Sequence, residues 1–219
     1  MKRKLVGSVC LVVLTFCALP AMAGPLYSNL GSGTSVYNCC SGWTVSGSGY
    51  LGSSFIAANE FQVTASGSVT EIDIAVGYVT GDNSFYVAVD ADNAGQPGTQ
   101  LAVFSNLSSN TTYGDCCGLV IITGISGLNL TTATNYWMVV GPTDTTATTW
   151  GAWNFSNSAT GIDEYSTDGG QTWNNNGEQP QGAFQILSGC CGTPEPTSLL
   201  LFGTALAAAL GAIRRQTKF

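Results

Sequence analysis

The chain has 219 residues, a formal net charge of −7 and no histidine. Its basic residues all lie in the two terminal segments: Lys2, Arg3, Lys4, Arg214, Arg215 and Lys218. The part between residues 24 and 194 is therefore acidic without any cationic side chain, which repels phosphate backbones and predicts no nucleic-acid partner. Without His, Lys or Arg it also lacks a Ser-His-Asp triad, a Schiff-base lysine and an imidazole metal ligand, so we expect it not to be an enzyme.

The N-terminal segment has the three parts of a secretory signal peptide: a basic cluster, an apolar stretch and small residues before a cleavage point. The residues at this point are Ala21, Ala23 and Gly24. We therefore predict a signal peptide over residues 1–23. A lipoprotein signal at Cys17 is the alternative, and it is disfavoured because bulky Phe16 stands where that signal needs a small side chain.

Residues 24–192, called the body below, are expected to form one domain, because roughly 170 residues suffice for one core and are too few for two. Short runs with hydrophobic residues at alternate positions are separated by Gly, Asn, Asp, Ser and Thr, which is typical of strands and turns. The predicted strands are 55–63, 69–78, 85–89, 101–104, 119–123, 136–140, 149–155, 161–165 and 183–187. We expect residues 31–54 and 90–98 to be loops. The pattern predicts an all-β, antiparallel β-sandwich or jelly-roll-like fold.

The body carries six cysteines in three adjacent doublets: Cys39-Cys40, Cys116-Cys117 and Cys190-Cys191. In an exported chain they predict disulfides, and because a bond between neighbours strains the backbone, each doublet should be tied to both of the others. Eight of the fifteen pairings meet this condition, and all of them clamp the same three segments together, with about 3–4 kcal/mol from each long loop. A thiolate metal site is the alternative, disfavoured because structural zinc cysteines are usually spaced by two to four residues.

An acidic loop with the pattern D-x-D-N-x-G begins at Asp90. Oxygen ligands on one turn suit calcium, although alanine occupies one EF-hand ligand position here and leucine stands where a bidentate glutamate is required. A turn rich in Asp and Asn is therefore the favoured interpretation. If calcium does bind, the ligands to test first are Asp82, Asp90 and Asp92. No other cofactor is expected.

The chain has five tryptophans, and an exposed indole on a β-sandwich can stack on a sugar ring. Trp150 and Trp153 are the candidates for such a sugar-binding platform. Packing in the core or beneath the disulfides is the favoured alternative. A glycosidase would need two facing carboxylates, and the neighbours Asp163 and Glu164 would point to opposite faces of a strand.

Residues 166–173, Ser-Thr-Asp-Gly-Gly-Gln-Thr-Trp, fit the Asp-box pattern S-x-D-x-G-x-T-W. The pattern predicts a hairpin turn in which Asp168 accepts backbone N–H groups while Trp173 packs underneath. Sialidases carry several copies of this motif together with arginines, and the body has one copy and no arginine. We therefore interpret the motif as structural.

The C-terminal segment, 193–219, begins with Pro194, Glu195 and Pro196, continues with an apolar run over 198–213, and ends in a basic stretch, 214–219. The run predicts a transmembrane helix of about 22 Å. Because this is shorter than the roughly 30 Å hydrocarbon core of a membrane, it favours transient anchoring. The basic end, with Arg214 and Arg215, should stay cytoplasmic. A permanent single-span anchor is the alternative.

The order of these three parts resembles the PEP-CTERM sorting signal. The resemblance implies export to the cell surface or beyond in a Gram-negative bacterium, transient inner-membrane anchoring through the tail, and processing by a membrane protease called exosortase. The polysaccharide that such bacteria secrete is then an expected partner.

The body also resembles choice-anchor domains, of the type designated R. The matching features are residues 26–30, LYSNL, the loop 92–98, DNAGQPG, and the Tyr136-Trp137 strand. This resemblance implies a location at the cell surface and no assigned activity. The leading hypothesis is a non-enzymatic surface or biofilm-matrix protein. The alternatives are a carbohydrate-binding module using exposed tryptophans, with or without calcium, and a hydrolase using acidic residues.

Overall fold

The computed structural model describes residues 24–189, so the predicted signal peptide, the third cysteine doublet and the sorting tail lie outside the described residues. Within them the chain is all-β, with antiparallel strand pairs and one four-residue helix, α1 (Ser48–Leu51). The predicted all-β, antiparallel fold of the body is confirmed for these residues. No helix in this part of the chain is long and apolar enough to cross a membrane.

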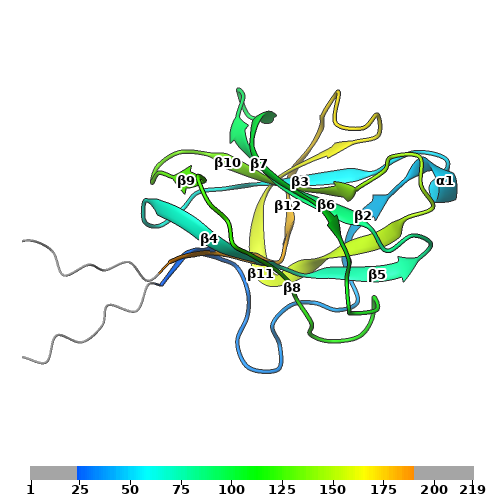
Figure 1. Ribbon diagram of the computed structural model, residues 1–219, viewed down its shortest axis with the longest axis horizontal. Coiled ribbons are helices and arrows are strands. Elements are labelled where there is room, and N and C mark those ends of the chain that lie inside the picture. Colours follow the sequence, from blue (N-terminus) through cyan, green and yellow to red (C-terminus); the bar gives the residue numbers. More distant parts are fainter. Residues whose placement is uncertain (1–23, 190–219) are drawn as a thin grey trace, which may run out of the picture. The chain divides into compact units, whose positions relative to one another are not determined.

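Two sheets face each other as a sandwich (Figure 1). The strands are β1 (Pro25–Ser28), β2 (Gly42–Ser46), β3 (Ile56–Phe61), β4 (Gly67–Ile74), β5 (Val76–Thr80), β6 (Phe85–Asp92), β7 (Pro97–Leu107), β8 (Val120–Thr123), β9 (Asn129–Leu130), β10 (Tyr136–Pro142), β11 (Trp150–Ser166), β12 (Asn174–Gly182) and β13 (Phe184–Ser188). One sheet has the order β1–β13–β4–β8, and β9 also pairs with β4. The other has the order β12–β11–β3–β10–β6–β7, and β2 and β5 also pair with β11.

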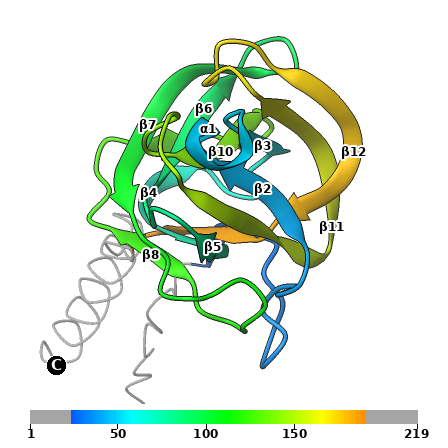
Figure 2. The same ribbon diagram turned by 90° about the vertical axis from the view of Figure 1, so that its right-hand side faces the viewer.

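The long strand β11 connects the two layers. Its first residues pair with β2 and β5, whereas Asp163 to Ser166 pair with β3. The register with β12 shifts between Phe155 and Thr160, and such irregularities bend a strand. Figure 2 shows β11 turning upward there to run beside β12. Because β5 follows β4 with one residue between them, β11 ties both layers into one core.

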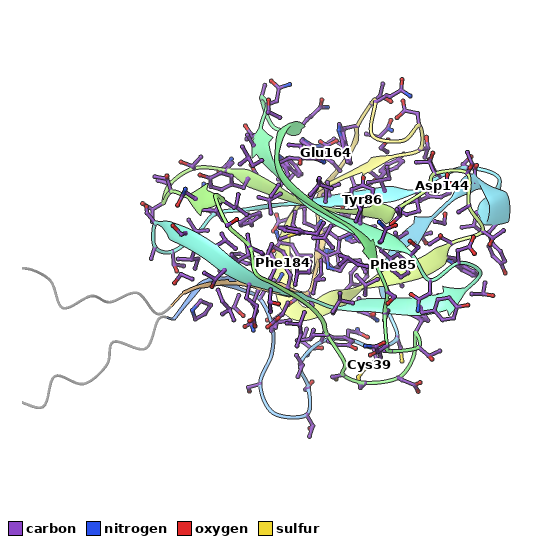
Figure 3. The ribbon with its side chains drawn as sticks, in the orientation of Figure 1. Cys39, Phe85, Tyr86, Asp144, Glu164 and Phe184 are labelled. Carbon is purple, nitrogen blue, oxygen red and sulfur yellow. A yellow bond between two sulfur atoms is a disulfide. The ribbon has the colours of Figure 1, made fainter. Side chains whose placement is uncertain are left out.

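Alternate side chains of the central strands fill the space between the layers. On β6, Phe85, Val87 and Val89 are at most 1% exposed and belong to the main core cluster. Figure 3 shows Phe85 and Phe184 between the two layers. Burying a large apolar side chain completely contributes about 1.5–3 kcal/mol, so these positions dominate the stability of the sandwich.

The outer face of the β3–β10–β6 layer is buried as well. Trp137, Val139 and Ala88 point to this face and pack with Ile56 and Ala58 in a second cluster. Side chains from β6, β11 and the turn after β11 cover the cluster: Tyr86, Ile162 and Trp173. All seven residues of β10 are consequently buried, which explains why its sequence shows little polar alternation.

Two loop predictions were wrong. Residues 31–54 contain β2 and α1, because β2 pairs with the first half of β11. The loop predicted over 90–98 is much shorter, since β6 extends to Asp92 and β7 begins at Pro97. The two strands predicted over 149–155 and 161–165 are the single strand β11, and strand β12 was missed because it is polar and contains Gly and Pro.

Close packing at Gly182 supports the fully buried Trp153. A Cβ atom at Gly182 would overlap the indole ring, whose Nε1 donates to the carbonyl of Ala183 at 3.3 Å. The ring has no room to move, because its side chain is 0% exposed. Glycine is therefore required here for the approach of β12 to β11.

We expect Gly182→Ala to lower the free energy of unfolding by about 1–3 kcal/mol, because the added methyl group overpacks the core. Urea unfolding followed by tryptophan fluorescence measures this change. Gly24→Ala is the matched control, since nothing lies within 4 Å of a Cβ atom there. Equal stability of the two variants would contradict the packing described above.

Candidate functional site

The acidic loop after β6 is a tight hairpin turn. The Asn93 amide donates to the Gln96 carbonyl at 2.8 Å, and the two residues between them have φ angles of 55° and 86°, as in type I′ turns. The Asp92 carboxylate accepts hydrogen bonds from the Gly95 amide at 3.1 Å and from Nε1 of Trp137 at 2.9 Å. Asp92 therefore ties the turn to the outer face of the sheet.

The Asp-box residues form the turn between β11 and β12, as predicted. Asp168 accepts hydrogen bonds from the backbone amides of Gln171 and Thr172 at 3.0 and 2.9 Å. The hydroxyls of Thr172 and Ser166 donate to the same carboxylate at 2.6 and 2.8 Å. These bonds, led by the Thr172 hydroxyl, lower the pKa of Asp168 to about 2. Trp173, at the end of the turn, packs on the outer-face cluster.

We expect Asp168→Asn to lower the melting temperature at pH 7, because the charged carboxylate accepts four hydrogen bonds in the fold. The lowered pKa contributes stability that is present above about pH 4 and is lost as the pH falls towards 2. Thermal unfolding monitored by circular dichroism between pH 2 and 7 should therefore show the difference from the wild type shrinking in acid. Asp115→Asn, at an exposed loop position, is the control and should show no such trend.

A groove of about 890 Å³ lies between these two turns, which are far apart in the sequence. Tyr86, Asp90 and Val139 line it from the outer face of the sheet, and Gln171 and Trp173 line it from the Asp-box turn. Both turns project from the same layer in Figure 1. The sequence singled out both motifs, and the structure brings them together in one site.

Asp90 is the unusual residue of this groove. It is 7% exposed, and among the described residues no group donates a hydrogen bond to its buried Oδ1 atom. Across the sheet it pairs with Trp137 on β10 and with Gln100 on β7. Burial raises the pKa of Asp90 to about 6. Burial, and secondly the nearby Asp90 carboxylate, raise the pKa of Tyr86.

The other buried carboxylates of the described chain all accept hydrogen bonds from amide side chains. The donors are Gln185 to Asp73 at 2.6 Å, Asn59 and Asn176 to Asp163 at 2.8 and 2.7 Å, and Asn175 to Glu164 at 2.6 Å. Even with two donors, burial raises the pKa of Asp163 to about 7. Asp73 and Glu164 each also leave one buried oxygen without a donor, so Asp90 differs from the other three in accepting no side-chain or backbone hydrogen bond at all from the described residues.

We expect Asp90→Asn to be more stable than the wild type at pH 7, by about 1–3 kcal/mol, since it removes an unpaired buried charge. The raised pKa means that the wild type loses stability as the pH rises from about 4 through 6, so the advantage of the variant should vanish below about pH 4. Urea unfolding at a series of pH values measures this. Glu178→Gln, at an exposed position, is the control and should show no such change with pH. If Asp90→Asn were less stable than the wild type at pH 7, the Asp90 carboxylate would have a partner in the fold.

The three aspartates named as the calcium ligands to test first do not lie together. Asp82 precedes β6 and accepts a hydrogen bond from the Thr148 hydroxyl at 3.0 Å, whereas Asp90 and Asp92 lie at the other end of this strand. Eight residues of extended chain separate Asp82 from Asp90 by on the order of 20 Å. No three carboxylates lie close enough to hold one metal ion within residues 24–189.

Trp153 is 0% exposed and packs in the main core, as the favoured packing interpretation predicts, so it cannot belong to a sugar-binding platform. Trp150 is half-buried, and the Tyr50 ring is stacked on it with centroids 5.0 Å apart. Tyr50 itself is 48% exposed. The two predicted tryptophans therefore do not form a shared surface, and the aromatic residues of the groove are Tyr86 and Trp173.

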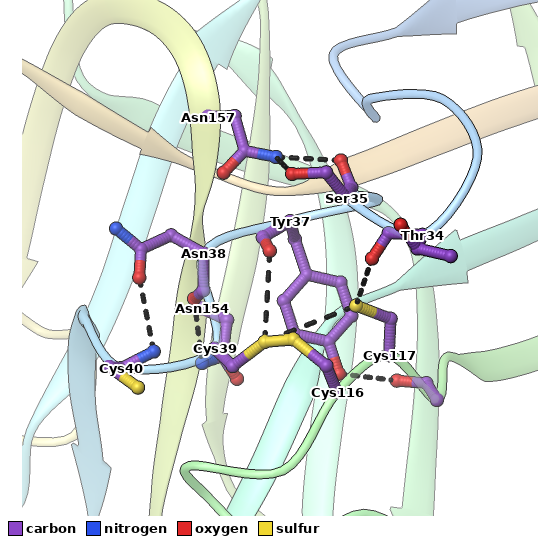
Figure 4. Close-up of a disulfide and its surroundings, with 11 residues drawn as sticks. Thr34, Ser35, Tyr37, Asn38, Cys39, Cys40, Cys116, Cys117, Asn154 and Asn157 are labelled. Carbon is purple, nitrogen blue, oxygen red and sulfur yellow. Dashed lines mark hydrogen bonds between the residues drawn. A yellow bond between two sulfur atoms is a disulfide. The ribbon is translucent and has the colours of Figure 1, made fainter.

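The first two cysteine doublets meet as predicted (Figure 4). Cys39 and Cys116 form a disulfide with Cα atoms 5.6 Å apart, and Sγ of Cys117 lies 3.9 Å from Sγ of Cys39. The described residues contain no disulfide of Cys40 or Cys117. Cys190 and Cys191 lie outside the described residues. The sulfurs of Cys39, Cys116 and Cys117 all lie within 4.8 Å of one another, and two of them are joined in the disulfide, whose sulfurs are not thiolate ligands.

Comparison with protein families identifies the tail. Residues 193–216 match the PEP-CTERM protein-sorting motif. The matched segment contains the Pro-Glu-Pro motif of residues 194–196 together with Arg214 and Arg215. It implies export and processing by exosortase at the surface of a Gram-negative bacterium. The curated proteins and the solved structures give no match to the chain.

Proposed function

We propose that this protein is a non-enzymatic component of the bacterial surface or extracellular matrix, released or attached there after exosortase removes its tail. The observation that carries the proposal is the sorting motif at residues 193–216, joined to a body that has no basic side chain. An acidic, disulfide-bonded sandwich suits an oxidising extracellular location. The resemblance to choice-anchor domains supports the same location.

The described carboxylates support the non-enzymatic part of the proposal. Asp163 and Glu164 are neighbours on β11, so their side chains point to opposite faces of the sheet. Both oxygens of Asp163 accept amide hydrogen bonds, which occupies them structurally. This pair therefore does not provide the facing acid and base that glycoside hydrolysis requires.

Carbohydrate binding is the second candidate function, and the groove between the two turns is the observation that favours it. Its aromatic rings and amide side chains suit sugars, whereas the predicted Trp153 is buried. Calcium assistance has no support from the positions of Asp82, Asp90 and Asp92. The extracellular polysaccharide of the host is the proposed partner.

Intact-mass analysis of the protein from its native host tests the sorting. We expect a mature chain that begins near Gly24 and ends within residues 194–197, with a gain of six hydrogens on reduction if the three doublets are joined by three disulfides. In a strain without exosortase, or in a variant with Ala at residues 194–196, the tail should be retained. A tail retained in the unmodified strain would contradict the proposal, and release of reducing ends from polysaccharides by the pure protein would contradict its non-enzymatic part.

A further inference from the structure

The groove between the β6–β7 turn and the Asp-box turn contains a buried carboxylate that the fold itself does not satisfy. Asp90 lines this groove, so the small exposed part of its side chain faces the groove. Leaving a buried acceptor without a donor lowers stability. Each of its three buried counterparts in the described chain accepts at least one amide hydrogen bond, although Oδ1 of Asp73 and Oε2 of Glu164 also lack a donor, whereas no described group donates to Asp90. A ligand that donates hydrogen bonds would satisfy Asp90.

The remaining lining narrows the chemistry of such a ligand. Gln100 and Gln171 are exposed amides that can both donate to and accept from hydroxyl groups. Tyr86 and Trp173 supply apolar ring surface. The volume of about 890 Å³ falls in the range of ordinary ligand sites. Hydroxyl donors attached to a ring with apolar C–H faces are the defining groups of a sugar.

The charge of the body decides between classes of sugar. The described residues include no Lys, Arg or His, so nothing in or near the groove can pair with a uronate, sulfate or phosphate group. The field of the acidic body repels such anionic chains. A divalent cation is also disfavoured, since no three carboxylates gather within the described residues. An uncharged sugar is the ligand that remains.

We propose that this groove binds a segment of a neutral polysaccharide, with Asp90 accepting hydrogen bonds from sugar hydroxyls and Trp173 and Tyr86 packing against the ring. The inference rests on the extracellular function proposed above, and it assigns the site and the class of ligand. This proposal explains why position 90 has a carboxylate and not an amide, because hydrogen bonds to a charged acceptor are stronger than those to a neutral one.

A second groove, of about 750 Å³, provides an internal comparison. Tyr27, Glu60, Glu178 and Gln181 line it, and each of the two carboxylates accepts a hydrogen bond from a described residue. The Tyr27 hydroxyl donates to Oε1 of Gln181 at 2.8 Å, and Thr160 donates to the Glu178 carboxylate at 2.9 Å. No lining carboxylate of this second groove combines burial with a missing donor in the described structure, so we expect it not to bind the polysaccharide.

The test is affinity electrophoresis of the mature protein purified from its host, in gels containing dextran, mannan, galactan or the neutral fraction of the host's own extracellular polysaccharide. We expect retardation by at least one of these and none by alginate, which is anionic. Asp90→Asn should weaken binding about 10- to 100-fold, the equivalent of losing one or two hydrogen bonds to a charged group. Glu178→Gln makes the same chemical change in the second groove and should bind like the wild type.

The outcomes separate the two proposals. Because Asp90→Asn is expected to be at least as stable as the wild type, a loss of binding with an unchanged or raised melting temperature is a direct effect on the site. Unchanged binding by Asp90→Asn, or no retardation of the wild type in any neutral gel, overturns the groove proposal even where mass analysis confirms sorting. A retained tail overturns the matrix function, whereas binding that depends on Asp90 would still establish the groove.

Discussion

The absence of cationic side chains from the body is the constraint on which the structure depends. Within residues 24–189 the only protein groups that can donate to a carboxylate are hydroxyls, amides, indoles, thiols and backbone N–H groups, because no side chain there can form an ion pair. Asp168 shows the outcome on the surface, where hydroxyl and backbone donors lower its pKa to about 2. Asp163 shows it in the interior, where two asparagines hold the carboxylate and burial still raises its pKa to about 7.

The same constraint connects the fold to the groove. Asp168 organises the Asp-box turn by accepting its backbone amides, and Trp173 at the end of this turn packs on the outer face of the sheet. Asp92 fixes the facing turn through Trp137. Asp90 lies between these two fixed turns without a donor of its own among the described residues. A residue whose replacement is expected to raise the stability of the fold, as Asp90→Asn is, is typical of a position retained for function.

Much of the fold could be predicted from hydrophobic alternation, including β6, β8, β10 and β13, because their apolar faces enter the core. Strand β12 could not, since its polar residues pair only with β11 and no periodic pattern marks it. The Asp-box turn was predictable because its hydrogen bonds are local. Core packing was the favoured interpretation for the tryptophans, but the sequence could not say which of Trp150 and Trp153 is inside, because one sequence does not show which face of a strand is buried.

The groove itself required the structure, because it joins two turns whose proximity depends on the pairing of β3 with both β10 and β11. The sequence contained part of the information about the groove lining. Tyr86 lies on the strand predicted over 85–89, and Asp90, four residues on, would share its face if that strand continued by one residue, but nothing local indicated that Asp90 would be buried without a donor.

The central claim is that Asp90 is buried without a donor in the free protein. The ¹³C chemical shift of the Asp90 carboxyl, assigned by comparison with Asp90→Asn, tests this claim most directly. It should titrate near pH 6 in the free protein and at lower pH once a neutral polysaccharide is bound, since hydrogen bonds from sugar hydroxyls favour the charged form. Titration near pH 4 in the free protein would show that Asp90 is already hydrated or paired, and would contradict the account.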